Sequence, residues 1–229
     1  MLPLNDAQPN RYTFFPFMTV SLIAVNTVIL IWELSLPEDS LNIVFYLFGF
    51  TPSMIWARQG FGMISNITSA FLHGDIYHLL SNMLFLWVFG RRVEDACGPL
   101  RFLVFYLLAG TTAHLVTAIV QSESSIPSIG ASGAIFGVMG AYLVLFSEGR
   151  IRTLLFFFSI IPTWPKIRAF WFVLYYLIIQ IPPALDVYFT GARYGIGYWA
   201  HLGGFFACIF IPLFIRPEAF ARYLSNVSV

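Results

Sequence analysis

The residues Gly130–Gly137, which read GASGAIFG, open an apolar stretch that runs on to Ser147. A second polar run, AHLGG at Ala200–Gly204, lies inside another apolar stretch, 196–215. The chain of 229 residues is 59% hydrophobic and 10% charged, with a mean hydropathy of +0.79, far outside the range of soluble globular domains. The sequence therefore predicts an integral membrane protein, and a serine and a histidine inside its spans suggest a nucleophile and its base.

Six apolar stretches come close to the roughly 20 residues that cross a hydrocarbon core of about 30 Å as a helix. They cover residues 14–36, 76–90, 102–120, 132–147, 169–185 and 196–215. We therefore expect an all-α polytopic membrane protein, a bundle of six transmembrane helices in the lipid bilayer. Two shorter apolar runs, 43–50 and 154–161, have about half the length needed to span. We expect them to lie at the interface or to dip partway into the membrane.

Basic residues give the orientation, because cytoplasmic loops collect Lys and Arg. With six spans and the N-terminus inside, ten of the 12 basic residues fall on the cytoplasmic side, and only Arg58 and Arg193 fall outside. This predicts a short cytoplasmic N-terminal tail at 1–13, a membrane domain at 14–216 and a short cytoplasmic C-terminal tail at 217–229. A long outer loop, 37–72, would join the first two spans.

The sequence argues against several other classes of protein. A formal net charge of +1, with the basic residues used for orientation, leaves no patch suited to nucleic acid. Neither Cys97 nor Cys208 is placed for a disulfide in an outer loop. No HExxH motif or Cys/His cluster indicates a metal, and we expect no cofactor. The first apolar run lacks a small-residue cleavage site, which predicts a retained helix instead of a signal peptide.

Four polar side chains share one depth in the expected bundle. Ser132 opens the fourth span at its outer end, and His201 lies roughly 7 Å into the sixth span from the same side. His78 and Asn82 stand four residues apart in the first turns of the second span, and hence on one helical face. Each of them alone is typical of helix packing or of an interhelical hydrogen bond. Their common depth in the outer third of the membrane indicates a site.

The chemistry of these groups fits acyl transfer. A neutral histidine can take the proton of a serine hydroxyl, and a carboxamide, an imidazole ring and backbone N–H groups are suitable donors for an oxyanion. No acidic residue lies at this depth, since Glu94, Asp95 and Asp186 are too far along their helices. The sequence therefore predicts a Ser-His dyad without the orienting carboxylate of a triad.

Three motifs carry a family resemblance. GxSG matches Gly130–Gly133, AHxxG matches Ala200–Gly204 and HxxxN matches His78–Asn82, in the family's order and on its helices. In these features the chain resembles a rhomboid intramembrane serine protease over about 14–216. The resemblance implies that Ser132 is the nucleophile and His201 the general base. It further implies an oxyanion-stabilising pair, His78 and Asn82, assisted by backbone amides around Ser132, including those at Gly130 and Gly133.

The resemblance also assigns supporting residues. Glu94 and Gly98 match the family's ExxxG at the cytoplasmic end of the second span, where the role would be structural. Phe136 stands where many members place a tyrosine that stacks on the histidine, and it can still pack against a ring. Small residues at the site, including Gly137 and Gly204, would pack the fourth and sixth helices together. Cys208 stands where a second glycine commonly follows, and it would slightly widen this contact.

Two other histidines and one loop motif complete the comparison with the family. His73 lies just outside the second span, where we consider a supporting role, and His114 in the third span is expected to be structural. The Trp-Arg pair that is often found in the outer loop of the family is replaced near Ile64 and Ser65.

The resemblance implies an intramembrane serine endopeptidase that cuts single-pass membrane proteins near the outer face, from a site open to that face. The alternative is a catalytically inactive relative that binds transmembrane helices for trafficking or degradation, but such relatives lack the serine or the histidine. A small-solute transporter is disfavoured, because paired broken half-helices and an intramembrane carboxylate are missing. The compact six-span form, without a seventh helix or a transit peptide, predicts a prokaryotic plasma membrane.

Overall fold

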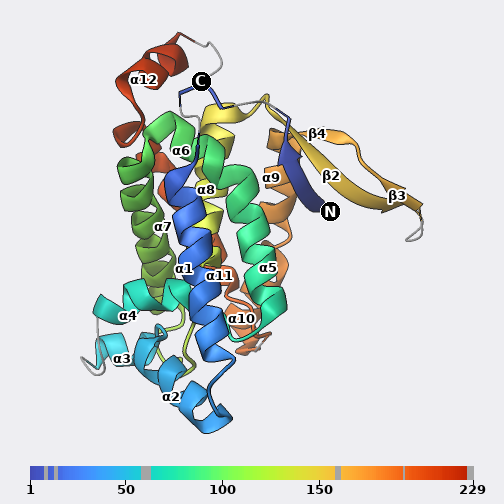
Figure 1. Ribbon diagram of the computed structural model, residues 1–229. Helices are drawn as coiled ribbons and strands as arrows, with labels where there is room; N and C mark the ends of the chain where they lie inside the picture. Colours follow the sequence, from blue (N-terminus) through green and yellow to red (C-terminus); the bar gives the residue numbers. More distant parts are fainter. Residues whose placement is uncertain (8–9, 13–14, 58–62, 158–160, 193, 226–229) are drawn as a thin grey trace.

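The computed structural model describes residues 1–7, 10–12, 15–57, 63–157, 161–192 and 194–225, and shows a helical bundle with a small β-sheet at one end (Figure 1). The α-helices are α1 (Phe17–Glu33), α2 (Glu38–Phe48), α3 (Pro52–Trp56), α4 (Met63–Thr68), α5 (Ile76–Phe85), α6 (Arg91–Cys97), α7 (Pro99–Val120), α8 (Ser132–Phe146), α9 (Ala169–Ile178), α10 (Ile181–Thr190), α11 (Tyr198–Phe206) and α12 (Pro217–Leu224). Two 3₁₀-helices, η1 (Ser69–Phe71) and η3 (Ala207–Leu213), and one π-helical segment, η2 (Leu86–Gly90), are also present among the described residues. The strands are β1 (Leu2–Asp6), β2 (Arg150–Phe157), β3 (Ile161–Thr163) and β4 (Lys166–Arg168).

Each expected span coincides with helical structure. The second continues from α5 through the π-helical η2 into α6, the fifth comprises α9 and α10, and the sixth comprises α11 and η3. Among the described residues, Pro99–Val120 and Ala169–Thr190 are long and apolar enough to cross a membrane. The segment Tyr198–Leu213 qualifies only together with α12, across a bend of 100°, and the apolar helices α1 and α8 are shorter. The architecture is that of a mostly helical, apolar bundle, and the count of six spans stays a prediction.

The expectation of purely α structure is wrong at one end of the bundle. The strand β2 pairs antiparallel with β1, β3 and β4, so the described part of the run 154–161 belongs to a sheet, and its place relative to the membrane stays a prediction. Residues 158–160 lie outside the described part of the chain. Ile151 and Thr153 are fully buried and alternate with basic residues, which is the two-residue period of a strand.

The N-terminal segment, expected as a polar tail, forms the edge of this sheet. In β1, Leu2 stands opposite Leu154 and Asp6 opposite Ile151. The division of the chain into two tails and a membrane domain stays a prediction.

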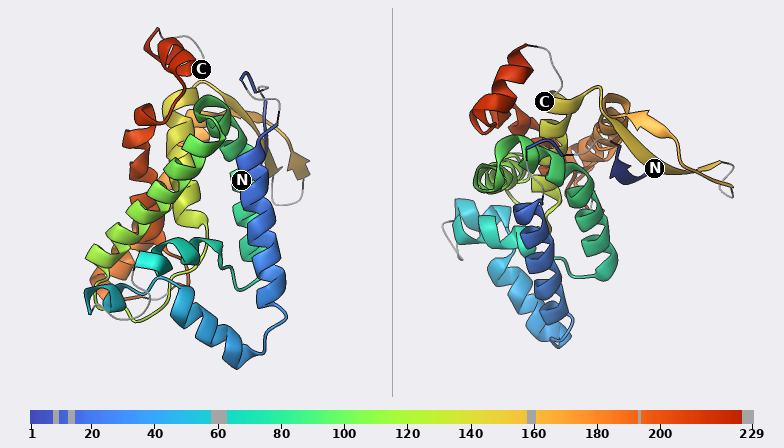
Figure 2. Two further views of the ribbon diagram at one scale, coloured as in Figure 1. Left: turned by 60° about the vertical axis from the view of Figure 1, so that its left-hand side comes forward. Right: turned by 45° about the horizontal axis from the view of Figure 1, so that its top comes forward.

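The segment 37–72, expected as a long outer loop, is itself largely helical. It holds α2, α3, α4 and η1, which lie at the end of the bundle opposite to the sheet (Figure 1). Figure 2 shows the same separation of the two ends from two further sides. The bundle therefore has one end covered by short helices and another end covered by the sheet and α12.

Small residues bring the central helices α7, α8 and α11 into close contact. A Cβ added at Gly204 would stand 1.9 Å from the carbonyl oxygen of Gly133, and one added at Gly137 would stand 2.4 Å from Cβ of Ala109. Cys208 faces Gly140, where an added Cβ would stand 2.9 Å from the cysteine Cβ. The volume of the cysteine is therefore accommodated by a glycine on α8.

The start of α1 is bound to the end of the second span. The carboxylate of Glu94, fully buried, accepts hydrogen bonds from the backbone N–H groups of Met18 and Thr19 and from the Thr19 hydroxyl, at 2.9, 2.8 and 2.7 Å. The two backbone N–H groups lie in the first turn of α1, where N–H groups have no acceptor within the helix. Gly98 follows α6 and lies against the guanidinium of Arg216, 3.2 Å from an added Cβ.

Candidate active site

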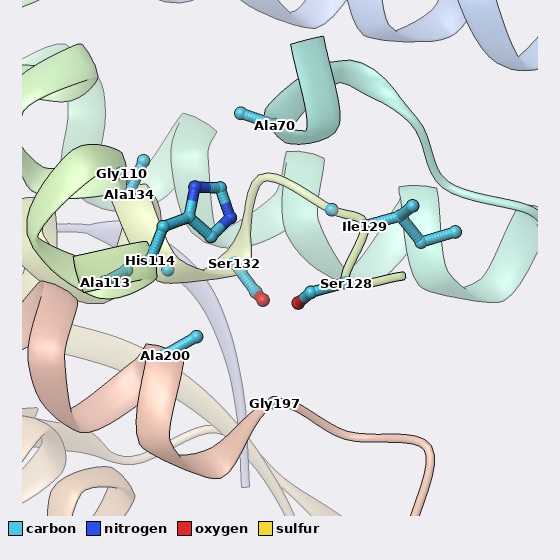
Figure 3. Close-up of a pocket in the computed structure, with 12 residues that line it drawn as sticks. Ala70, Gly110, Ala113, His114, Ser128, Ile129, Ser132, Ala134, Gly197 and Ala200 are labelled. Atoms are coloured by element: carbon cyan, nitrogen blue, oxygen red, sulfur yellow. The ribbon is translucent and has the colours of Figure 1, made fainter. Parts of the chain in front are cut away.

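Ser132 is the first residue of α8, and the loop before it is fixed to two other segments. Ser128 pairs with Phe50 through two backbone hydrogen bonds, and the N–H of Gly130 donates to the carbonyl of Ser69 at 2.8 Å. Gly130 has φ +114°, a conformation that residues with a side chain rarely adopt. Figure 3 shows the Ser132 hydroxyl beside Ser128, with the start of α11 at Ala200 and Gly197 on the facing side.

His201 stands in the first turn of α11 and faces the serine. Its Nε2 lies 2.9 Å from Oγ of Ser132. Its ring is stacked on Phe136 of α8, with the ring centroids 4.3 Å apart and the planes within 7°. Phe136 lies one helical turn after Ser132, so a single helix presents both the hydroxyl and the surface that holds the imidazole.

A residue that the sequence analysis did not identify completes this arrangement. Nδ1 of His201 lies 2.8 Å from the side-chain carbonyl oxygen Oε1 of Gln180, at the break between α9 and α10. Gln180 is not an acidic residue, and only acidic residues were expected to orient the histidine. A glutamine inside an apolar span, two residues before the Pro182-Pro183 pair, was the available signal.

His78 and Asn82 approach the loop before Ser132 from the α5 side. The carboxylate of Asp75 caps α5 by accepting from the N–H groups of Tyr77 and His78. A Cβ added at Gly130 would stand 2.7 Å from Nε2 of His78 and 3.6 Å from Nδ2 of Asn82. Both side chains thus converge on the backbone two residues before Ser132.

The donors available at this point differ between the two side chains. Nδ2 of Asn82 is buried and has no hydrogen-bond partner among the described residues. Nδ1 of His78 lies 2.9 Å from the carbonyl oxygen of His73 and therefore carries the proton that it donates. A neutral His78 then has an acceptor at Nε2, and only the imidazolium form offers an N–H there.

The remaining histidines, His73 and His114, are both buried. His73, in the loop before α5, is buried with its ring centroid 5.1 Å from that of His78, and this burial lowers the pKa of His73 to about 4. His114 of α7 is bound to Asn66, with Nδ1 2.8 Å from Oδ1, and is stacked on Phe50 with centroids 4.3 Å apart. His114 therefore joins α7 to the short helices at this end.

Two cavities lie near the site, and only the smaller one is lined by Ser132 itself. A pocket of about 20 Å³ beside Ser132 and His114 has room for one water molecule (Figure 3). A larger open cavity of about 650 Å³ is lined by His73, His78 and Gly197, among others. In the part of the chain that the structure describes, no group of three or more His, Cys, Asp or Glu could hold a metal ion.

The fold and the site define a class of protein: a helical membrane bundle with a serine and a histidine in contact between two central helices. The family model described as Rhomboid domain matches residues 60–218, and the chain belongs to the rhomboid family. Members of this family are membrane-integral and are generally intramembrane serine proteases.

Curated relatives support this membership. The chain is 33% identical over 154 residues to RHOMBOID-like protein 5 of Arabidopsis thaliana, covering 66% of this chain and 44% of the relative. It is 38% identical over 101 residues to the mitochondrial Rhomboid protein 1 of Saccharomyces cerevisiae, covering 42% and 29%. With Rhomboid protease GluP of Bacillus subtilis it shares 44% identity over 84 residues, covering 37% and 16%.

The chain thus spans less than half the length of these relatives. Because one of them is mitochondrial and another bacterial, the comparisons do not support the expected assignment to a prokaryotic membrane.

Proposed function

We propose that the protein is an intramembrane serine endopeptidase that hydrolyses peptide bonds in or next to transmembrane segments of single-pass membrane proteins. The observation that carries this proposal is the 2.9 Å contact between Oγ of Ser132 and Nε2 of His201, with the imidazole held against Phe136. A general base must reach the proton that it removes, and this distance is within hydrogen-bond range.

The first half of the reaction forms an acyl-enzyme. His201 takes the hydroxyl proton as Ser132 attacks the peptide carbonyl carbon, and the carbonyl oxygen becomes an oxyanion. The unpaired amide of Asn82, the protonated form of His78 and the free N–H groups at the start of α8 are the candidate donors to this oxyanion. The imidazolium then protonates the leaving amine, and the peptide bond breaks.

The second half restores the enzyme with water. A water molecule from the open cavity attacks the acyl carbon while His201 takes its proton, and the imidazolium then returns that proton to Oγ of Ser132. We propose that this cavity opens to the outer membrane face. The proposal is supported by the basic residues of β2 and β4, which lie at the opposite end of the bundle and favour the cytoplasmic side (Figure 1).

The test compares variants of the purified protein in detergent. The wild type should be labelled by a fluorophosphonate probe. It should also cleave a fluorescent single-pass reporter that has a helix-breaking residue near one membrane face. Neither reaction should occur with Ser132→Ala or His201→Ala. Ser21→Ala, on the exposed face of α1, is the matched control and should retain both activities. Absence of labelling in the wild type as well as in every variant, with each protein shown to be folded, would refute the protease and favour a relative that only binds transmembrane helices.

A further inference from the structure

Gln180 is a polar side chain in the middle of an apolar span. It is buried, with 6% of its surface exposed, and it follows the last turn of α9. Pro182 and Pro183 follow after Ile181, and neither has an N–H to donate to the preceding turn, so the helix is interrupted here. A buried amide at a helix break in a membrane protein is costly unless both of its ends are hydrogen-bonded.

Both ends of the Gln180 amide are hydrogen-bonded. Nε2 donates to the backbone carbonyl oxygen of Tyr176 at 3.0 Å, one turn earlier in α9. This bond fixes which end of the amide carries nitrogen, and it leaves the carbonyl oxygen Oε1 directed at Nδ1 of His201, 2.8 Å away. An amide oxygen can only accept, so Nδ1 of His201 must carry the proton.

The tautomer of His201 follows from this contact. A neutral imidazole carries one proton, so with Nδ1–H bound to Gln180 the other nitrogen, Nε2, has a free lone pair. The Ser132 hydroxyl then donates to Nε2 across their 2.9 Å separation. The opposite tautomer would place an N–H on Nε2 and could not accept the serine proton.

No other residue competes for this role among those that the structure describes. Nδ1 of His201 has no second hydrogen-bond partner there. The nearest acidic residue along the same span, Asp186, is bound instead to the hydroxyls of Tyr194 and Thr190.

We propose that Gln180 is a positioning residue of the active site, a neutral group that fixes the base His201 in the tautomer able to accept the Ser132 proton. The inference rests on the proposed protease function. It replaces the unassisted dyad with a Ser-His-Gln chain, in which α9 contributes to the site through the backbone carbonyl of Tyr176.

The experiment replaces the acceptor and then restores it. Gln180→Met keeps the length and approximate volume of the side chain but removes the acceptor, and kcat for the reporter should fall about 10- to 100-fold with KM within twofold. In Gln180→Glu, a protonated carboxyl can donate to Tyr176 and accept from His201, so kcat should return to within about threefold of wild type. Wild-type kcat in Gln180→Met, or equal losses in both variants, would overturn the proposal.

A second bond between the same helices provides the matched control. The indole N–H of Trp199 donates to the carbonyl of Ala184 at 2.9 Å and also joins α10 to α11. If Gln180 acted only as a tether between helices, Trp199→Phe would lower kcat as much as Gln180→Met does. We expect Trp199→Phe to keep kcat within about threefold of wild type.

A direct reading of the tautomer separates this inference from the protease function. Nitrogen NMR of ¹⁵N-histidine-labelled protein, with His201 assigned by its loss in His201→Gln, should show protonated Nδ1 in wild type and a mixture of tautomers in Gln180→Met. Protonated Nε2 in neutral His201 of the wild type would refute the positioning role even in an active enzyme. If wild type failed to cleave yet showed protonated Nδ1, the protease function would fail while the Gln180 contact stood.

Discussion

The contact between Gly204 and Gly133 sets how closely α11 approaches α8, and it should therefore control the distance between His201, the proposed base, and Ser132, the proposed nucleophile. A Cβ at position 204 would stand 1.9 Å from the carbonyl oxygen of Gly133, roughly 1.5 Å closer than the ordinary contact that begins at 3.4 Å. The obstacle is backbone, which cannot rotate away as a side chain can. His201 precedes Gly204 by one helical turn, and Ser132 is adjacent to Gly133.

Gly204→Ala should consequently separate Ser132 from His201. A displacement of α11 by about 1 Å would lengthen the 2.9 Å contact of His201 with Ser132 to about 4 Å, beyond hydrogen-bond range. We expect the rate of fluorophosphonate labelling to fall about 100-fold or more, because misplacement of this size costs about two orders of magnitude. The overpacked helices should also lose about 1–3 kcal/mol of unfolding free energy. A time course of labelling in detergent measures the change in rate, and thermal unfolding of the same samples measures the change in stability.

Gly110→Ala is the matched control, since it makes the same substitution on α7, which packs against both α8 and α11. There an added Cβ would stand 3.6 Å from Cβ of Ala134, an ordinary contact. This variant should be labelled within twofold of the wild-type rate. Wild-type labelling by Gly204→Ala, with an unchanged unfolding midpoint, would refute the reasoning that this backbone contact fixes the site.

Two further predictions concern stability. Glu94→Gln should lower the unfolding free energy by about 1.5–3 kcal/mol, because hydrogen bonds to a carboxylate are lost at the start of α1. The rate of fluorophosphonate labelling should stay near wild type. A parallel loss of labelling would contradict a purely structural role for Glu94. Burial, reinforced by His78, lowers the pKa of His73 from its ordinary value of 6.5 to about 4, so the unfolded chain binds more protons than the folded protein between these values. The unfolding free energy should therefore be highest above pH 6.5 and fall by up to about 3 kcal/mol toward pH 4. Thermal unfolding across this range should show a smaller decline in His73→Phe, and identical declines would disprove the assignment to His73.

The meeting of Ser132, His201, His78 and Asn82 could be predicted because a membrane helix converts sequence position into depth. Each residue advances 1.5 Å along the axis, so polar groups at equal distances from one membrane face must lie at one level. Depth alone, however, does not give lateral neighbours. That Ser132 contacts His201, and that His78 and Asn82 approach Gly130 instead, depends on how the helices pack.

Two features, the strand β2 and the contact of Gln180 with His201, were not predicted from the sequence. The run 154–161 was expected from its length to lie at the interface or to dip into the membrane, whereas the two-residue period just before it, with Ile151 and Thr153 buried, indicates the strand β2 that continues into the run. Gln180 was missed because only acidic residues were considered as partners for the histidine. Its partner His201 is 21 residues away on another helix, and only the break at the following prolines turns the amide toward that histidine.

The treatment of buried polar groups distinguishes a structural role from a chemical one in this molecule. The carboxylate of Glu94 is fully buried and accepts three hydrogen bonds, so its burial is compensated within the fold. Asn82 is also buried, yet its Nδ2 has no partner among the described residues, which costs about 1–3 kcal/mol in the resting protein. That cost is recovered if an acceptor arrives, and a negatively charged oxygen beside Ser132 would be such an acceptor. An uncompensated donor next to an aligned Ser-His pair is therefore the arrangement expected of a site that binds the transition state more tightly than the substrate.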